Sequence, residues 1–430
     1  MDDIIELADR LWRGETDVTR HHPLAMAGGL AEIADGVAFV ASFARVSAFT
    51  TGDGLVLVDT GHSLAASSIH EQVRAWSPEH LNTAIYSHGH IYHVSGVYVF
   101  EEEAVRNRWP TPVVVAHEAV RARFERYVMT AGYNAVINRR QFQLPGLEWP
   151  VDYRYPDRTY SDELSLDVGG VRFELRHAKG ETDDHTWTYV PSKKVLCSGD
   201  LFIWASPNAG NPQKVQRYPL EWARALREMV QLGAEVLLPG HGFPVVGAER
   251  VRTALSETAE LLESLVGQTL EMMNAGARLD EVLHSVEAPR HLMERPYLRP
   301  VYDEPEFIVR NLWRLYGGWY DGNPATLKPA PDAAIAGEVA RLAGGAPVLA
   351  KRSLELLRGG DLRLAGHLAE MAALADPGIA FVHDARSQVF SVLRDDATST
   401  MAKGIFGWAA TESASENERL GGTGSGVTAP

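Results

Sequence analysis

Short apolar segments alternate with amphipathic segments from the start of the chain to about residue 265. The apolar segments are typical of buried strands, whereas residues 63–79 repeat their apolar positions with a helical period behind a cap at Ser63. This alternation favours an α/β fold in which helices enclose two sheets, an αββα sandwich. The predicted strands are two between 36 and 60, joined by a Thr51-Gly52-Asp53-Gly54 hairpin, and segments at 83–86, 164–176, 186–190, 194–198 and 235–238.

The remainder of the chain has the periodicity of an all-α region. Residues 348–375 are predicted to form a helix pair that turns at Gly359-Gly360-Asp361, and residues 421–430 are rich in Gly, Ser and Thr. We therefore predict an α/β domain at residues 1–265, a helical domain at 266–415 and a disordered tail at 416–430.

Three histidines, His88, His90 and His93, follow the predicted strand 83–86 closely. A loop at a strand end can direct His88 and His90 to one metal ion and His93 to a second, and neutral imidazole is a common ligand of Zn²⁺. The alternative is that histidine is simply abundant, since the chain contains 16. The clustering, and the acidic and histidine residues beside glycines further along the chain, favour a metal site.

The run Ser87-His88-Gly89-His90-Ile91-Tyr92-His93 resembles the His-x-His-x-Asp-His motif of the metallo-β-lactamase superfamily, with Tyr92 where the family has Asp. The resemblance implies the αββα fold of that family, and it implies that Asp59 supports the metal-binding loop. Four further segments stand in the family's order behind apolar strands, at 54–61, 177–185, 196–200 and 238–242.

A second resemblance concerns residues 299–307 and 310–324, which are similar to the segment that joins the catalytic and dimerisation domains of metallo-β-lactamase-type alkylsulfatases. Those enzymes carry a carboxylate where other members have a third histidine, and this chain has Glu181 there. The resemblance extends from about residue 40 to about residue 410. It implies a catalytic domain at 1–265 and a dimerisation domain at 266–415, and therefore a homodimer.

The resemblance also implies the ligands of two divalent metal ions. His88, His90 and Glu181 would hold one ion, His93 and His241 the other, and Asp200 would bridge the two. We expect zinc. Manganese and iron are alternatives, because a carboxylate in place of histidine makes the first site harder. Two such ions can share a hydroxide and lower its pKa.

Tyr92 is the main departure from the family pattern, and we class it with Asp200 as a catalytic candidate. A neutral phenol is a poor metal ligand and a hydrogen-bond donor to substrate, whereas a phenolate would favour a strong Lewis acid such as Fe³⁺. The alternative is that the Tyr92 ring packs against the strands and the second metal site is weaker or empty.

Fixed donors are needed to bind an anionic ester. By resemblance to alkylsulfatases, Asn134 is the first candidate, with Arg139 or Arg140 behind it. Lys214 and Arg217, in the loop after Asp200, are the other candidates. For each basic residue the alternative is an ordinary solvated surface charge.

Composition narrows the choice of partners and location. The net charge of −15 opposes the binding of polyanions, so we expect no nucleic acid partner. The single cysteine, Cys197, excludes an intrachain disulfide and lies in an apolar strand, where we expect it to be buried. The start of the chain does not resemble a signal peptide, and no apolar stretch approaches a membrane span. We therefore expect a cytoplasmic protein without an integral membrane segment.

These features predict a metal-dependent hydrolase that cleaves alkyl sulfate esters to alcohol and sulfate with a metal-bound hydroxide. One alternative is hydrolysis of another ester, such as a thioester, lactone or phosphodiester, at a metal site altered by Tyr92. Another is a dimeric binding protein that has lost its second metal. The presence of His93, Asp200 and His241 argues against that last alternative.

Overall fold

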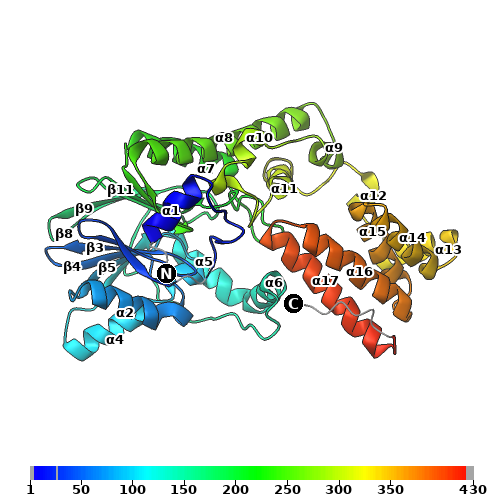
Figure 1. Cartoon of the computed structure of the whole chain (residues 1–430), viewed down its shortest axis with the longest axis horizontal. Coiled ribbons are helices and arrows are strands. Elements are labelled where there is room, and N and C mark those ends of the chain that lie inside the picture. The colour runs from blue at the N-terminus through cyan, green and yellow to red at the C-terminus, as the bar shows by residue number, and fades with distance from the viewer. Residues whose placement is uncertain (1–3, 26–27, 423–430) are drawn as a thin grey trace. The chain divides into compact units, whose positions relative to one another are not determined.

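The computed structural model describes residues 4–25 and 28–422, and the described chain divides into two compact units (Figure 1). The first unit comprises the residues up to 131 together with 150–319. The second comprises 132–149 together with the residues from 320 onward. The second unit is thus built from two segments that lie far apart in the sequence.

The first unit contains two mixed sheets. In the seven-stranded sheet the strands from β1 to β4 pair antiparallel and those from β4 to β7 pair parallel. Within the described part of the six-stranded sheet, β11 and β12 pair parallel and all the other neighbouring strands pair antiparallel. In spatial order the sheets are β1 (Leu30–Ala34), β2 (Val37–Val40), β3 (Val46–Thr51), β4 (Gly54–Val58), β5 (Leu81–Ile85), β6 (Val113–His117) and β7 (Arg158–Tyr160), and β13 (Val245–Val246), β12 (Val236–His241), β11 (Val195–Ile203), β10 (Thr186–Val190), β9 (Val171–His177) and β8 (Glu163–Val168).

One apolar core joins the two sheets. Phe49 of β3 and Phe173 of β9 meet edge to face with ring centroids 5.4 Å apart, an arrangement that aromatic rings favour. Val56 and Ile85 from the first sheet and Cys197 from the second are buried in the same cluster. Cys197 is therefore a small core residue, as the sequence predicts.

Helices cover the outer faces of both sheets (Figure 1). Helices α2 (Ala66–Trp76) and α4 (Tyr98–Asn107) lie over the seven-stranded sheet, and α7 (Pro219–Gln231) and α8 (Ala248–Asn274) lie over the other. The predicted αββα sandwich is confirmed. The other helices of this unit are α1 (Ile4–Trp12), α3 (Ile91–Val94), α5 (Ala119–Met129), α9 (Leu279–Leu283), α10 (Arg290–Met293) and α11 (Pro305–Gly317).

Some predicted element boundaries were wrong. Residues 36–60 hold three strands, and the single strand expected at 164–176 is a hairpin, because Gly169 and Gly170 both adopt positive φ (51° and 83°) and turn the chain. The helix expected from residue 63 begins as a 3₁₀ turn. Its cap is His62, whose side chain accepts a hydrogen bond from the Leu64 amide.

The second unit is entirely helical where it is described. The predicted helix pair at 348–375 is confirmed as α14 and α15, which turn at Gly360 with φ of 82°. Helix α17 continues to Arg419, beyond the predicted start of the tail at 416, and residues 423–430 lie outside the described residues. The helices are α6 (Ala131–Phe142), α12 (Pro324–Leu327), α13 (Asp332–Ala343), α14 (Ala346–Arg358), α15 (Leu362–Ala375), α16 (Ala380–Asp396) and α17 (Thr400–Arg419).

Among the described residues, no single helix has the length and apolar character to cross a membrane. Only the pair α13 and α14, bent by 86° at its break, meets that criterion when the two helices are taken together.

Candidate metal centre

The chemistry-bearing residues of the first unit gather at the carboxyl ends of its parallel strands. Asp59 directly follows β4, and the histidine loop follows β5, with α3 beginning at Ile91. From the other sheet, His241 ends β12, and Asp200 lies in β11 where the pairing with β12 becomes irregular. Glu181 comes from the loop between β9 and β10. Strand ends of two sheets therefore supply one site.

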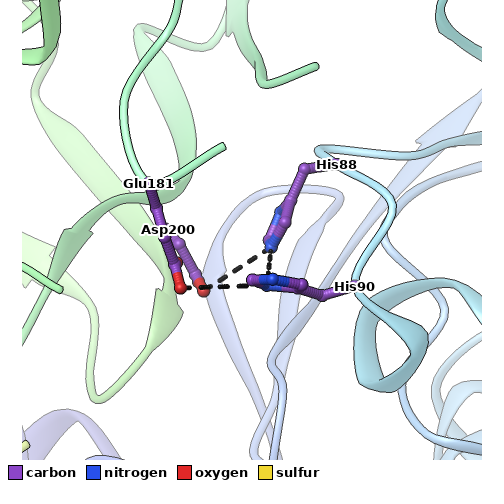
Figure 2. A group of neighbouring side chains, drawn as sticks. All are labelled: His88, His90, Glu181 and Asp200. Carbon is purple, nitrogen blue, oxygen red and sulfur yellow. Dashed lines mark hydrogen bonds and ion pairs between the residues drawn. The ribbon is translucent and has the colours of Figure 1, made fainter. Parts of the chain in front are cut away.

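The first group of ligand-type side chains consists of His88, His90, Glu181 and Asp200, all of which are buried. Figure 2 shows the two imidazoles facing the two carboxylates. His88 Nε2 lies 2.7 Å from His90 Nδ1 and 3.7 Å from Asp200 Oδ2, and His90 Nδ1 lies 3.9 Å from Glu181 Oε1. Four donors of this kind around one point are the usual complement of a zinc site.

The second group consists of His93, His241 and the same Asp200. The two carboxylate oxygens are divided between the imidazoles, because Asp200 Oδ1 lies 3.4 Å from His93 Nε2 and Oδ2 lies 3.4 Å from His241 Nε2. Asp200 thus belongs to both groups. The structure brings together all six residues that the sequence predicts as metal ligands, in the predicted two sets.

Hydrogen bonds behind the imidazoles select the tautomer of each ring. His241 Nδ1 donates to the Phe43 carbonyl oxygen at 2.7 Å, and His93 Nδ1 donates to Asp59 Oδ2 at 2.7 Å. Ser87 Oγ donates to Asp59 at 2.8 Å and accepts from His88 Nδ1 at 2.9 Å. In each of these rings Nδ1 is engaged and Nε2 faces the site, which is the nitrogen that metal coordination would use.

Two glycines allow the backbone to approach the site closely. A Cβ on Gly89 would lie 2.8 Å from Arg123 Cδ, and a Cβ on Gly240 would collide with Asp200 Oδ1. The Gly89 amide donates to Asp184 Oδ2 at 2.8 Å, and Asp184 is in turn paired with the buried Arg123 at 2.9 Å. This pair fixes the loop between His88 and His90.

The electrostatics of the protein alone favour a cation in the site. Burial by itself lowers the pKa of His93, but the carboxylates of Asp200 and Asp59 outweigh it and raise the pKa to about 10. Burial also raises the pKa of Asp200, yet His241 and His93 bring it well below its ordinary value. For Glu181, burial and the nearby Asp200 carboxylate raise the pKa well above its ordinary value. In the absence of a metal ion, Glu181 and His93 therefore retain protons beside Asp200, and a bound cation would take the place of that positive charge.

Divalent metal ions fit these residues. His93 Nε2 and Asp200 Oδ1 face each other and are otherwise unpaired among the described residues, although both are buried. Imidazole nitrogens and carboxylate oxygens in this ratio suit Zn²⁺, Mn²⁺ or Fe²⁺. His88, His90 and Glu181 would hold one ion, His93 and His241 the other, and Asp200 would touch both.

Tyr92 lies between the two groups. Its hydroxyl is 3.0 Å from His90 Nδ1, and its ring stands edge-on to Phe43 with centroids 5.3 Å apart. Its ring centroid is 5.1 Å from that of His93 and 5.7 Å from that of His241. Burial raises the pKa of the phenol well above its ordinary value, so Tyr92 is a neutral hydrogen-bond donor here.

Arg217 lies beside the first group. Its side chain is buried, and Nη2 is 3.6 Å from Glu181 Oε1. Asn208 of the same loop donates to Glu181 Oε1, and its own Oδ1 is buried without a hydrogen bond to any described residue. Lys214 is half-buried on this loop, and burial together with the charge of Arg217 lowers its pKa to about 7. The sequence predicts Lys214 and Arg217 as candidate donors to an anionic substrate, but it does not predict a role for Asn208.

The segment from 299 to 317 holds this loop in place. Asp303 accepts hydrogen bonds from the amides of Gly210 at 2.7 Å and Asn211 at 3.1 Å. In α11, Asn311 Nδ2 donates to the Arg217 carbonyl oxygen at 3.1 Å. This segment of unusual composition therefore positions the residues around Glu181.

The other predicted substrate-binding residues lie on α6. Asn134 and Arg140 each interact with other residues of the protein. Arg139 Nε donates a hydrogen bond to the Leu147 carbonyl oxygen at 2.7 Å. Asn138 Nδ2 donates to the Asn134 carbonyl oxygen at 2.8 Å. All belong to the second unit, whereas the metal-ligand groups belong to the first. A role for Asn134, Arg139 and Arg140 in substrate binding stays a prediction.

Comparison with known families covers both predicted regions. Residues 42–241 match the metallo-beta-lactamase superfamily and contain every residue of the two ligand groups. Residues 278–416 match the alkyl sulfatase dimerisation family.

Individual relatives are alkylsulfatases by name. The chain is 28% identical over 355 residues to a linear primary-alkylsulfatase from a Pseudomonas strain, covering 77% of this chain and 66% of that protein. It is 27% identical over 355 residues to an (R)-specific secondary-alkylsulfatase from Pseudomonas, covering 75% and 53%. With the alkyl/aryl-sulfatase of Saccharomyces cerevisiae it shares 24% identity over 378 residues, covering 81% and 58%. The chain thus matches less than two thirds of the length of these relatives.

A solved structure extends the comparison to the fold. The inverting secondary-alkylsulfatase from Pseudomonas superposes with a TM-score of 0.80 at 23% identity, over 93% of this chain and 66% of that one. Fold, domain order and sequence relatives agree with the geometry of the site. The chain therefore contains a metallo-β-lactamase superfamily domain at residues 42–241, followed by an alkyl sulfatase dimerisation domain at residues 278–416.

Proposed function

We propose that this protein is a metal-dependent sulfuric ester hydrolase that converts alkyl sulfates and water to alcohols and sulfate. The observation that carries the proposal is the pair of buried histidine–carboxylate groups that share Asp200. They stand in a chain whose relatives are named alkylsulfatases. Two bound divalent cations would supply Lewis-acid stabilisation of developing negative charge and would lower the pKa of a water molecule.

The protein's own residues supply orientation. Asp59 and the Phe43 carbonyl oxygen fix the rings of His93 and His241, so their lone pairs keep one direction. Asp59 also binds the Ser87 amide at 2.7 Å, which fixes the start of the histidine loop. Burial of the site removes the competing hydration that would weaken each of these interactions.

Basic residues beside the first group suit an anionic substrate. Arg217 and Lys214 lie on one loop next to Glu181, and Arg217 is held rigidly by backbone carbonyl oxygens of Val215 and Asn208. A fixed guanidinium is well matched to the oxygens of a sulfate group. The Tyr92 hydroxyl lies at the same edge of the site, 3.0 Å from His90 Nδ1.

The first test is release of inorganic sulfate from octyl sulfate by the purified protein supplied with Zn²⁺, Mn²⁺ or Fe²⁺. We expect metal-dependent release that His241→Ala reduces by at least about a hundredfold, because loss of a catalytic metal ligand removes the transition-state stabilisation it supports. His284→Ala is the matched control, because His284 is exposed at the end of α9 and should leave the rate unchanged. Absence of release by a metal-loaded protein would contradict the proposal.

One observation favours an alternative substrate. Tyr92 replaces a carboxylate of the family motif with a neutral donor beside both groups, and such a change can alter which ester is cleaved. If octyl sulfate is not cleaved, we expect the same metal-dependent assay to detect hydrolysis of a thioester, a lactone or a phosphodiester. His241→Ala should abolish that activity as well.

We also propose that the protein is a homodimer, because residues 278–416 match the dimerisation family. Light scattering coupled to size-exclusion chromatography should give twice the chain mass of 47.2 kDa. A mass equal to one chain at micromolar concentration would contradict this assembly.

A further inference from the structure

The two ligand groups are chemically unequal. The first offers four side chains, His88, His90, Glu181 and Asp200, whereas the second offers three, and its one carboxylate is the shared Asp200. Protein zinc sites commonly use four ligands when the protein supplies all of them, and each carboxylate contributes a negative charge as well as a donor atom. The first group provides four protein ligands, whereas the second provides three.

Tyr92 does not complete the second group. Its hydroxyl pairs with His90 Nδ1 at 3.0 Å, and His90 is a member of the first group. Its ring stands beside both imidazoles of the second group, 5.1 Å from His93 and 5.7 Å from His241 between ring centroids. The hydroxyl is therefore engaged with the first group, and Tyr92 presents its ring rather than a ligand atom to His93 and His241.

The charges of the site reinforce the difference. The first group contains two carboxylates, Glu181 and Asp200, and Glu181 is held in place by Asn208 and by Arg217, whose Nη2 lies 3.6 Å away. A second cation would meet His93, His241 and an Asp200 carboxylate already engaged by the first cation, with no carboxylate of its own. It would also be repelled by that cation at short range. Asp59 reaches His93 only through its Nδ1 hydrogen and offers no direct ligand.

We infer that divalent cations fill this site in a fixed order, first at His88, His90, Glu181 and Asp200 and then at His93 and His241, with Tyr92 weakening the second step. The supply of metal would then set the balance between a singly and a doubly loaded protein. The inference rests on the proposed function only in that both require cations at these residues. The weakly held cation is the one at His93 and His241.

Calorimetric titration of the metal-free protein with Zn²⁺ tests the order, with bound ions counted by elemental analysis after equilibrium dialysis. We expect two steps whose affinities differ by at least about tenfold, since the loss of supporting groups around a metal commonly costs this much. Tyr92→Asp should strengthen the second step by at least about tenfold and leave the first in place. Tyr92→Phe is the matched control. It removes the hydroxyl without adding a ligand and should leave the second step weak.

His241→Ala separates the two steps further, because it should remove the second and retain the first. Two equal steps in the native protein, or a second step that Tyr92→Asp leaves unchanged in a folded variant, would overturn the inference. Folding of each variant is checked by circular dichroism. Two-step binding without hydrolysis of octyl sulfate would contradict the proposed function alone, whereas absence of any bound ion would contradict both.

Discussion

Asp59 shows how a residue outside the ligand groups can determine the geometry of the site. It adopts φ of 61°, which is unusual for a residue with a side chain and costs roughly 1–3 kcal/mol when the surroundings enforce it. Its two oxygens accept hydrogen bonds from the Ser87 amide, the Ser87 hydroxyl and the His93 ring. One strained residue thus connects the end of β4 to both ends of the histidine loop.

Replacing Asp59 by Asn tests this role. The amide keeps the shape, but it removes the negative charge and one acceptor, so His93 loses its orientation and basicity. We expect Zn²⁺ affinity, measured by competition with a chromophoric chelator, to fall by about 10–100-fold. Asp35→Asn is the control, since Asp35 is exposed and its ion pair with Lys193 should matter little. An unchanged affinity in Asp59→Asn would contradict the role.

At this scale the sequence indicates the ligand-type residues and, through the family resemblance, Asp59, but not the other residues that support them. His88, His90, His93 and His241 could be predicted because they stand in short motifs at strand ends. Asn208 could not, because a lone Asn in a loop has no pattern and its contact with Glu181 depends on how the loop folds. The ion pair between Arg123 and Asp184 likewise joins residues far apart in the sequence, so no local sequence motif predicts it.

Helix α11 and the segment before it act as one element on the loop that carries Arg217. Asp303 is fully buried and accepts hydrogen bonds from Gly210, Asn211 and Glu304 amides. Burial raises the pKa of its carboxyl to about 7 against the opposing effect of these donors. The composition of the segment could be recognised from sequence, but its role in bracing the loop could not, since bracing depends on tertiary contacts.

The raised pKa of Asp303 predicts a pH dependence of stability. Between the ordinary value of 3.8 and about 7 the folded protein binds a proton that the unfolded chain has lost. The free energy of unfolding therefore falls as the pH rises through this window, by at most ~4 kcal/mol for this group. The contribution is complete at the acid end and lost above about pH 7.

Urea unfolding of the native protein and of Asp303→Asn at about pH 5 and about pH 8 isolates this contribution. The variant cannot titrate, so the native protein should lose stability relative to it as the pH rises. Contributions from the other groups largely cancel in the difference. A difference in stability that is the same at both pH values would show that Asp303 does not titrate in this range.

At the scale of the whole molecule, the second unit is not a continuous stretch of chain. Residues 132–149 join the helices that follow residue 320, and Gln143 Nε2 donates to the Gly404 carbonyl oxygen of α17 at 2.7 Å. The sequence could not indicate this, because a local sequence pattern does not specify which distant helices a segment packs against. Substrate-binding predictions placed on α6 therefore concern a segment that folds with the C-terminal helices.

Gly404 makes this long-range packing testable. A Cβ at this position would lie 2.8 Å from Gln141 Cα and would also collide with the Gln141 carbonyl oxygen. Because both atoms belong to the backbone of α6, relief requires one helix to move. We expect Gly404→Ala to cost about 1–3 kcal/mol of stability, despite the better helix propensity of alanine.

Gly267→Ala is the matched control. Gly267 lies in α8, and a Cβ added there would meet no described atom within 4 Å, so alanine should stabilise by up to ~1 kcal/mol. Thermal unfolding of the two variants compares the effects, and Zn²⁺ titration should give the native result for both, because neither touches the ligand groups. If Gly404→Ala were as stable as Gly267→Ala, α6 and α17 would not pack closely. Residues 132–149 would then not be part of the second unit.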